Sequence, residues 1–430
     1  MKTNVRRVKD KTACNTTATV YSAVLPMIYI SKILGLAPFN SSTACPTKTG
    51  LGYAVLMLFM VLAWAVYSFI WNIRYSYPYL TYAFIVPHIL GRFLCYSTVI
   101  ISLLFACTNN RHVYKSILHT LSDTDRYLFD SPKKSSNMYN RIKLFLYVQI
   151  ILVIFMWVGV FYYDRRVWTG DAGSSHHTFE YFTVFIATIV YVQFVDFVIL
   201  LKHRFKEMNS QLSELISISN DGLNWEEIFW QELHKNQLEK VIFCYNKPQH
   251  TWKRNSRVIN LETKSEANLL ILQKVHSNLH DIAKMVNACF SLPILTDMAF
   301  TSLLIVQSLY NALTEALNLS DINIYGSSKE GMTLFLLWTV IMVTKMVCIA
   351  TSCQVASNEA NSTGVLVQKL LLCCGEDSAG LQDFSYQLLH RELHFTAYGF
   401  FTLDCTLLHS LLGAITTYLI FLIQFRFISS

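Results

Sequence analysis

The sequence predicts an all-α membrane protein with seven transmembrane helices, a cytosolic N-terminus, an extracellular C-terminus and a cytosolic helical anchor bundle. Three observations lead to this prediction. Hydrophobic residues make up 53% of the 430 residues, and only 15% are charged, against about 25% in a typical soluble domain. Seven stretches are apolar over the roughly 20 residues that a helix needs to cross a bilayer. The basic residues are distributed very unevenly between the segments that join these stretches.

The seven predicted spans follow one another along the whole chain. An earlier apolar stretch, 20–39, is interrupted by Pro26, Lys32 and Gly35. It is therefore expected to be an interfacial helix, and its polar interruptions make it a poor signal peptide. The spans are 51–71, 80–107, 144–163, 179–201, 290–313, 332–353 and 395–425.

The distribution of Lys and Arg gives the orientation. The segments 1–50, 108–143, 202–286 and 354–394 together hold 28 basic residues, and the alternate segments hold 5. Because cytosolic loops carry the excess of positive charge, the N-terminus is expected to be cytosolic. An odd number of spans then places the C-terminus outside the cell.

These assignments divide the chain into six regions. A cytosolic N-terminal segment with the interfacial helix is followed by helices 1–4, a cytosolic region of helical extensions with a mobile loop, helices 5–6, a cytosolic loop and helix, and helix 7. Their bounds are 1–50, 51–201, 202–289, 290–353, 354–394 and 395–430. The polar stretch 244–264 is expected to form the mobile loop.

One helical stripe leads from the large cytosolic region into the fifth span. Its members, which are apolar except for one histidine, recur at alternating spacings of three and four, as on one face of a helix. The stripe either packs inside one subunit or holds subunits together in a multi-helix bundle. Its members are Leu269, Leu272, His276, Leu279, Ala283, Val286 and Phe290.

The C-terminal stretch of the chain resembles a known signature. A Thr417-Tyr418 pair, five apolar residues and Gln424-Phe425 are similar to the closing motif of insect gustatory receptors. The stretch 395–404 upstream also resembles this family, and 29–39 is similar to the N-terminal segment of its fructose-receptor branch.

This resemblance implies a sugar-gated, nonselective cation channel of the plasma membrane of sensory neurons, formed by four identical subunits. In such a channel the seventh helices line the pore, and Gln424 and Phe425 form its gate. Ile420, Thr417 and Tyr418 belong to the same stretch, and the two motif residues Thr417 and Tyr418 either line the pore or brace the helix. Fructose, permeant cations, lipid and three further copies of the chain are the expected partners.

Polar and small residues on one side of the seventh span indicate a helix face that contacts water or a partner helix. The residues near one helical face are Thr402, Thr406, His409, Gly413, either Thr416 or Thr417, and Gln424. The alternative is that the Thr hydroxyls bond within the helix and that the small residues pack against a neighbour.

Four charged residues lie within different spans. Asp196, Asp297, Lys345 and Asp404 all fall near the predicted cytosolic boundary. Because charges in a bilayer are costly unless they are paired or face water, they are expected to form a structural network of ion pairs and hydrogen bonds. Some of them would otherwise shape the exit route of the cations.

The outer halves of the spans carry enough polar and aromatic side chains to hold a small polyol. Aromatic faces suit the C–H surfaces of a sugar, and amides and charged groups can satisfy its hydroxyls. For single residues the alternative is the aromatic belt at the membrane interface. The candidate ligand residues are Tyr82, His88, Arg92, Trp157, Tyr181, Gln307, Tyr310, Asn311, Trp338 and Thr339.

Other classes of protein are disfavoured. The sequence has no phosphate-binding glycine loop, no zinc-like Cys/His spacing and no catalytic triad, so no enzyme, cofactor, metal site or nucleic-acid partner is expected. A G-protein-coupled receptor would have the opposite orientation, and a transporter would show internal repeats or broken helices. A receptor for bitter compounds or carbon dioxide remains the main rival to a sugar receptor.

Overall fold

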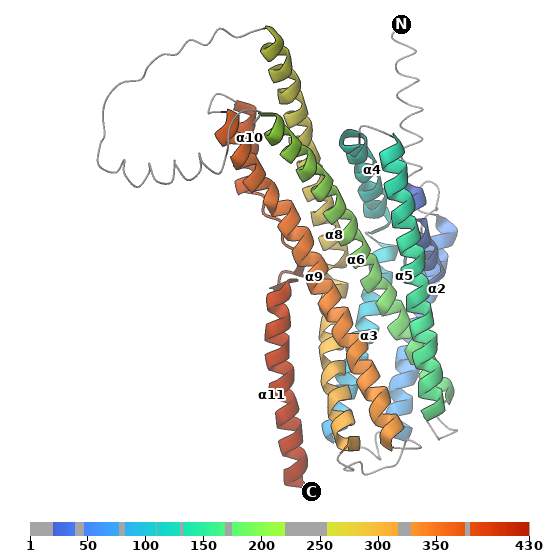
Figure 1. Cartoon of the computed structure of the whole chain (residues 1–430). Helices are drawn as coiled ribbons and strands as arrows, with labels where there is room; N and C mark the ends of the chain where they lie inside the picture. The colour runs from blue at the N-terminus through green and yellow to red at the C-terminus, as the bar shows by residue number, and fades with distance from the viewer. Residues whose placement is uncertain are drawn as a thin grey trace, which may run out of the picture. The chain divides into compact units, whose positions relative to one another are not determined.

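The structure, a computed structural model, is almost entirely helical in the part of the chain that it describes (Figure 1). That part comprises residues 20–38, 47–76, 82–108, 110–129, 132–167, 174–219, 256–316, 328–374 and 379–429. The helices are α2 Lys48–Trp71 with a π-helical extension η1 Asn72–Ser76, α3 Tyr82–Cys107, α4 Asn110–Leu128, α5 Pro132–Val167, α6 Ser174–Ser219, α8 Ser256–Ala316, α9 Ser328–Cys374, α10 Ala379–Leu389 and α11 Cys405–Ser429.

Seven of the helical segments are long and apolar enough to cross a membrane, which confirms the predicted fold class. They are Lys48–Tyr75, Ile85–Cys107, Ser135–Val167, Phe179–Ser217, Asn268–Ala316, Lys329–Leu372 and Cys405–Gln424. The orientation, which rests on the distribution of Lys and Arg, stays a prediction.

The predicted interfacial helix is shorter than expected. It covers Val20–Ile33 and buries one face, which includes Val24 and Met27. Gly35 then adopts a φ of +75°, a left-handed conformation that glycine accepts readily. A Cβ at this position would lie 3.2 Å from the Met57 side chain of α2, so the turn also needs a small residue.

The chain forms two compact units. The first consists of Met1–Lys202, Asp281–Ser357 and His394–Ser430, and contains the greater part of the membrane-length segments. The second consists of His203–His280 and Asn358–Leu393, so that α6, α8 and α9 each contribute residues to both units.

The second unit is a helical bundle built around aromatic rings. The ring of His276 on α8 lies 5.8 Å from that of Phe205 on α6 and 6.0 Å from that of Phe384 on α10. The Asn209 side chain of α6 donates hydrogen bonds to α9, including one of 2.7 Å to the Glu359 carbonyl oxygen. These contacts agree with the anchor bundle that the sequence predicts.

The helical stripe of α8 is buried within the single chain. All seven of its members are less than a tenth exposed, from Leu269 to Phe290. This favours the interpretation that the stripe packs inside one subunit over the alternative that it is a contact between subunits.

The prediction for one irregular segment was wrong in part. The predicted mobile stretch 244–264 is already helical from Ser256 onward, and the rest of it lies outside the described residues. The inner segment 108–143 contains the separate helix α4, whose charged and apolar residues alternate at helical spacing.

The seventh span begins ten residues later than predicted. Residues 395–404 are not helical but form a hairpin of β1 Thr396–Ala397 and β2 Phe401–Thr402. Tyr398 and Gly399 have φ values of 51° and 76°, which a helix cannot contain. Thr402 therefore does not belong to the polar face of the helix.

Asp404 explains why α11 starts where it does. Its Oδ1 accepts hydrogen bonds from the backbone N–H groups of Thr406 and Leu407, at 2.9 and 3.3 Å. Oδ2 accepts a bond of 2.7 Å from the Thr402 hydroxyl. An aspartate that satisfies the first free N–H groups of a helix is a strong N-cap.

We expect Asp404→Ala to destabilise the start of α11 by about 1 kcal/mol, the usual cost of losing an N-cap. Hydrogen bonds from Thr406 and Thr402 lower the pKa of Asp404 below its ordinary value. The carboxylate therefore stabilises the protein at neutral pH, and this contribution is lost as the pH falls through the lowered pKa. Asp404→Asn, which keeps a capping oxygen, is the matched control in a thermal melt. Equal melting temperatures for the Ala and Asn variants would contradict the capping role.

Candidate ligand-binding site

The first unit encloses a cavity of about 250 Å³ between five helices. The cavity lies near the ends of α5 and α8 and near the beginnings of α3, α6 and α9, which are the predicted outer ends of the spans. Its walls mix polar and aromatic side chains, as binding sites for small molecules do. Among the lining residues are His88, Arg92, Tyr96, Asp164, Glu180, Tyr181, Phe300, Gln307, Ser308, Asn311, Phe335 and Trp338.

An ion pair between α3 and α6 forms one wall of the cavity. Arg92 Nη2 lies 2.6 Å from Glu180 Oε2, and Nη1 contacts the other carboxylate oxygen. Arg92 also donates to the Ser68 hydroxyl at 2.9 Å and to His88 Nε2 at 3.1 Å. His88 accepts this bond, so its Nε2 carries no proton. The two-pronged geometry fixes the guanidinium in a single orientation.

Six of the ten predicted ligand residues line this cavity. They are His88, Arg92, Tyr181, Gln307, Asn311 and Trp338. Among the described residues, the side-chain amides of Gln307 and Asn311 form no hydrogen bond of their own. The two amides are one helical turn apart on α8, so a single ligand with hydroxyl or carbonyl groups could bind to both.

Of the other four predicted residues, three lie elsewhere. Trp157 packs behind the wall, with its ring 5.5 Å from Trp338 and 6.2 Å from Tyr181. Thr339 is 2.8 Å from the Ser308 hydroxyl and does not line the cavity. Tyr310 faces α11 instead, and Tyr82 begins α3 with its side chain outside the described part.

The sequence analysis missed two acidic residues of the site. Glu180 pairs with Arg92 from a position 88 residues away, and Asp164 lies at the end of α5. A buried Arg in a span requires a counter-charge, so the carboxylates at the ends of neighbouring spans were the available signal.

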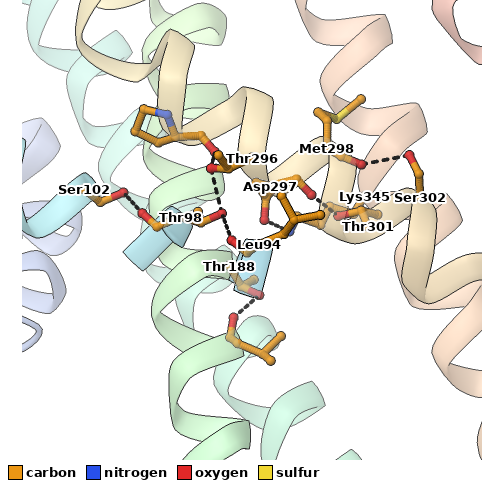
Figure 2. Close-up of polar contacts among 12 residues, drawn as sticks. Leu94, Thr98, Ser102, Thr188, Thr296, Asp297, Met298, Thr301, Ser302 and Lys345 are labelled. Atoms are coloured by element: carbon orange, nitrogen blue, oxygen red, sulfur yellow. Dashed lines mark hydrogen bonds and ion pairs between the residues drawn. The ribbon is translucent and has the colours of Figure 1, made fainter. Parts of the chain in front are cut away.

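A second buried polar cluster lies one to two helical turns from the cavity residues Phe300 and Trp338, and Figure 2 shows its polar contacts. Lys345 Nζ of α9 donates a hydrogen bond of 2.7 Å to Asp297 Oδ1 of α8, and both side chains are buried. The ammonium group also lies 5.2 Å from the ring centroid of Tyr191 on α6. The hydroxyls of Thr98 and Thr296, 2.9 Å apart, join α3 to α8 beside this pair. The cluster therefore connects four helices below the cavity.

The predicted network of ion pairs and hydrogen bonds does not connect all four charged residues with one another. Asp297 and Lys345 pair with each other, but Asp404 caps α11 on the surface. Asp196 on α6 is buried beside Gln149, and its Oδ1 has no hydrogen-bond partner in the described part of the chain. Charged residues at similar depth need not share a helical face, so depth alone could not identify the pairs.

The stretch of α8 that lines the cavity also contacts α11 with another face. Val306 and Tyr310 form a buried cluster with Leu422, against which Ile415 and Leu419 pack. Gln307 and Asn311, next to these residues in sequence, point to the cavity. A single helix thus lies between the cavity and the C-terminal motif.

The gate residues that the sequence predicts lie on a sparsely covered helix. Only 6% of the membrane-length part of α11 is buried in the single chain, and Gln424, Ile420 and Tyr418 are exposed. The Thr417 hydroxyl donates to the Gly413 carbonyl oxygen at 2.9 Å, as the intrahelical alternative requires. Phe425 lies in α11, but its side chain is outside the described part.

The fold and the cavity together define a multi-pass membrane protein with a pocket for a small molecule within its helical bundle. The sequence pattern of the 7tm chemosensory receptor family matches residues 24–429. Because this match covers nearly the whole chain, the protein belongs to that family, which consists of receptors and not of enzymes.

Comparisons with individual proteins agree with this family. Over 169 residues the chain is 31% identical to the gustatory receptor for bitter taste 66a of Drosophila melanogaster, a match that covers 38% of this chain and 31% of that protein. Over 157 residues it is 26% identical to the gustatory and pheromone receptor 32a of the same species. This match covers 36% of this chain and 33% of that protein. The matched segments thus span about a third of these relatives.

The fold is similar to that of a solved insect receptor. The olfactory receptor OR5 from Machilis hrabei, whose structure is a complex with eugenol, matches with a TM-score of 0.52 over 93% of this chain and 96% of that one. The sequence identity is 14%, so this likeness concerns the fold alone.

Proposed function

We propose that this protein is a gustatory receptor that acts as a ligand-gated, nonselective cation channel in the plasma membrane. A small tastant binds in the cavity between α3, α5, α6, α8 and α9. Four copies of the chain surround a central pore that α11 lines, with Gln424 and Phe425 as its gate. Family membership supports the receptor function, and the channel activity extends the resemblance described above.

The observation that carries this proposal is the double contact of α8. Gln307 and Asn311 line the cavity, whereas Val306 and Tyr310 pack against Leu422, two residues before the gate motif. A ligand that draws the amides of α8 toward it would shift the opposite face of the helix against α11. Such a shift changes the equilibrium between closed and open states if the ligand binds one of them more tightly.

The exposure of α11 supports the assembly. Leu412, Ile420 and Phe421 are each at least half exposed in the single chain, whereas 83% of the apolar window of α6 is buried. An uncovered apolar helix in a membrane faces lipid or other protein. Symmetric copies would cover one side of it and leave another side to line a pore.

Fructose stays a prediction from the sequence. The stretch 29–39, which carries the resemblance to the fructose branch, does not line the cavity in the described part of the chain. A sugar would find partners in the two amides and aromatic surfaces in Tyr181 and Trp338. The rival prediction, a bitter compound, would use the same aromatic surfaces and fewer of the polar groups.

The experiment that tests the proposal is to record currents from cells that express this chain alone while a panel of tastants is applied. The panel includes fructose, glucose, bitter compounds and carbon dioxide. We expect a cation conductance that at least one tastant evokes without any G-protein step. Surface-expressed protein that conducts with none of them would contradict the proposal, and a response to bitter compounds with silence to sugars would reject fructose only.

We expect Val306→Ala to shift the gating equilibrium without changing the cavity. The substitution removes two buried carbon atoms from the contact with Leu422, which is worth about 1.6 kcal/mol or roughly 15-fold in an equilibrium constant. The ratio of resting to maximal current and the half-maximal tastant concentration should therefore change by up to this factor. Leu313→Ala, at an exposed position of the same helix, is the matched control. Identical dose–response curves for both variants would show that the contact of α8 with α11 has no influence on gating.

A further inference from the structure

We infer that the cavity binds a ligand with an organic ammonium group, held by Asp164 and the aromatic side chains beside it. This inference rests on the proposed receptor function and narrows the ligand to one chemical class. Two observations support it: the net negative charge of the cavity lining and the arrangement of its aromatic side chains. A neutral sugar would not compensate this charge.

Asp164 supplies the charge. Its side chain lines the cavity and the residue is only 8% exposed. The Tyr181 side chain forms a hydrogen bond with it, but no Lys, Arg or His of the described chain forms an ion pair with it. The neighbouring Arg165 contributes an electrostatic attraction to it, and the Arg165 guanidinium lies 5.4 Å from the ring centroid of Phe161. Asp164 is thus a buried carboxylate for which the described part of the chain supplies no ion-pair partner.

The other charges of the cavity do not compensate Asp164. The charged lining residues in the described part of the chain are two carboxylates and one guanidinium. Arg92 is committed to Glu180 by two contacts, and His88 accepts a bond from Arg92, which leaves it neutral. With Asp164 ionised, the site has one excess negative charge. Because a buried charge without a counter-charge is costly, a ligand with one positive charge fits better than a neutral one.

The aromatic side chains supply the shape. Tyr181 and Trp338 line the cavity with their ring centroids 5.7 Å apart. Phe161 and Trp157 pack behind them, at 5.4 Å and 6.2 Å from Tyr181, and hold the rings in place. Rings next to a carboxylate are the arrangement that recognises alkylated ammonium groups, because the ring faces attract cations. A methylated ammonium gains from both the rings and the charge.

The test uses two probes of the same shape that differ in charge. Choline carries a trimethylammonium group, and 3,3-dimethylbutan-1-ol has a neutral tert-butyl group in its place. Both are applied to the full-length protein, once as purified protein in a thermal melt and once as expressed channel in current recordings. We expect choline to act at a concentration at least about tenfold lower than the alcohol, as a favourable buried charge contact implies.

Substitution then locates the charge. Asp164→Asn keeps the shape of the side chain and should remove the preference for choline, so that the two probes act within about twofold of each other. Asp123→Asn, on α4 outside the cavity, is the matched control and should leave the preference unchanged. This comparison also separates binding in the cavity from block of the pore by ammonium ions, since Asp164 does not lie on α11.

Two results would overturn the inference: equal action of both probes on the natural protein, which requires no variant, or an undiminished preference for choline in Asp164→Asn. The outcomes separate the inference from the proposed function. A channel that tastants open but that ignores the charge of the probes contradicts only the ammonium site. A charge-dependent rise in melting temperature with no evoked current by any tastant contradicts only the channel.

Discussion

Replacing Lys345 by Met is expected to destabilise the protein by about 3–5 kcal/mol, because it leaves the buried Asp297 without its counter-charge. The lysine ammonium lies 2.7 Å from Asp297 Oδ1, and Oδ2 of the same carboxylate has no hydrogen-bond partner in the described part of the chain. The ammonium is therefore the main compensation for this charge. The loss would appear as a lower melting temperature and as less folded protein after extraction from the membrane.

The double variant Lys345→Met with Asp297→Asn distinguishes the charge from the shape of these side chains. Removing both charges should restore most of the stability, since a buried ion pair is often no better than a neutral pair of similar volume. Lys329→Met at an exposed position near the start of α9 is the control and should change little. If the single and double variants are equally unstable, the pair acts through packing rather than through charge.

The double variant also tests a role in gating. Asp297 and Lys345 lie one to two helical turns from the cavity residues Phe300 and Trp338, and Tyr191 ties the pair to α6. A stable double variant with altered tastant sensitivity would indicate that the pair positions α8 relative to α9. Unaltered tastant sensitivity would show that the ion pair contributes to stability and not to gating.

The membrane-length helices could be predicted from the sequence because a bilayer requires long apolar stretches. The beginning of the seventh helix was misplaced because 395–404, which contains three Phe, was counted with the apolar helix that follows. Gly399 and the Asp404-Cys405-Thr406 cap were the signals for a turn and a helix start. The hairpin at that point shows that a high content of hydrophobic residues does not by itself specify a helix.

The cavity could be predicted only in part because it joins residues that are far apart in the sequence. His88 and Arg92 were visible as neighbours on one helix, but Glu180 reaches Arg92 from another helix. Spacing on α8 was also misleading. Gln307 and Asn311 are 40° apart around the helix at about 100° per residue, whereas Tyr310 lies on the side that faces α11. Helical spacing groups residues by face, but only packing decides what each face contacts.

Replacing Leu279 by Asp is expected to prevent folding of the second unit, because this side chain is 0% exposed. A carboxylate at this position would lose its hydration without gaining a partner, at a cost of several kcal/mol, and the cavity of the lost leucine adds about 2–5 kcal/mol. The sum is comparable to the whole stability of an ordinary domain. We expect the variant to yield little folded protein and no defined oligomer.

The position of the leucine on α8 decides between the two interpretations of the helical stripe. Leu270, on the same helix, is 57% exposed, so Leu270→Asp should leave the subunit folded. If the stripe packs inside one subunit, Leu279→Asp abolishes folded protein of every size, as measured by fluorescence-detected size-exclusion chromatography. If the stripe instead joins subunits, Leu279→Asp would give stable, folded single subunits with a normal melting transition. The complete burial of Leu279 in a single copy of the chain argues for loss of the subunit itself.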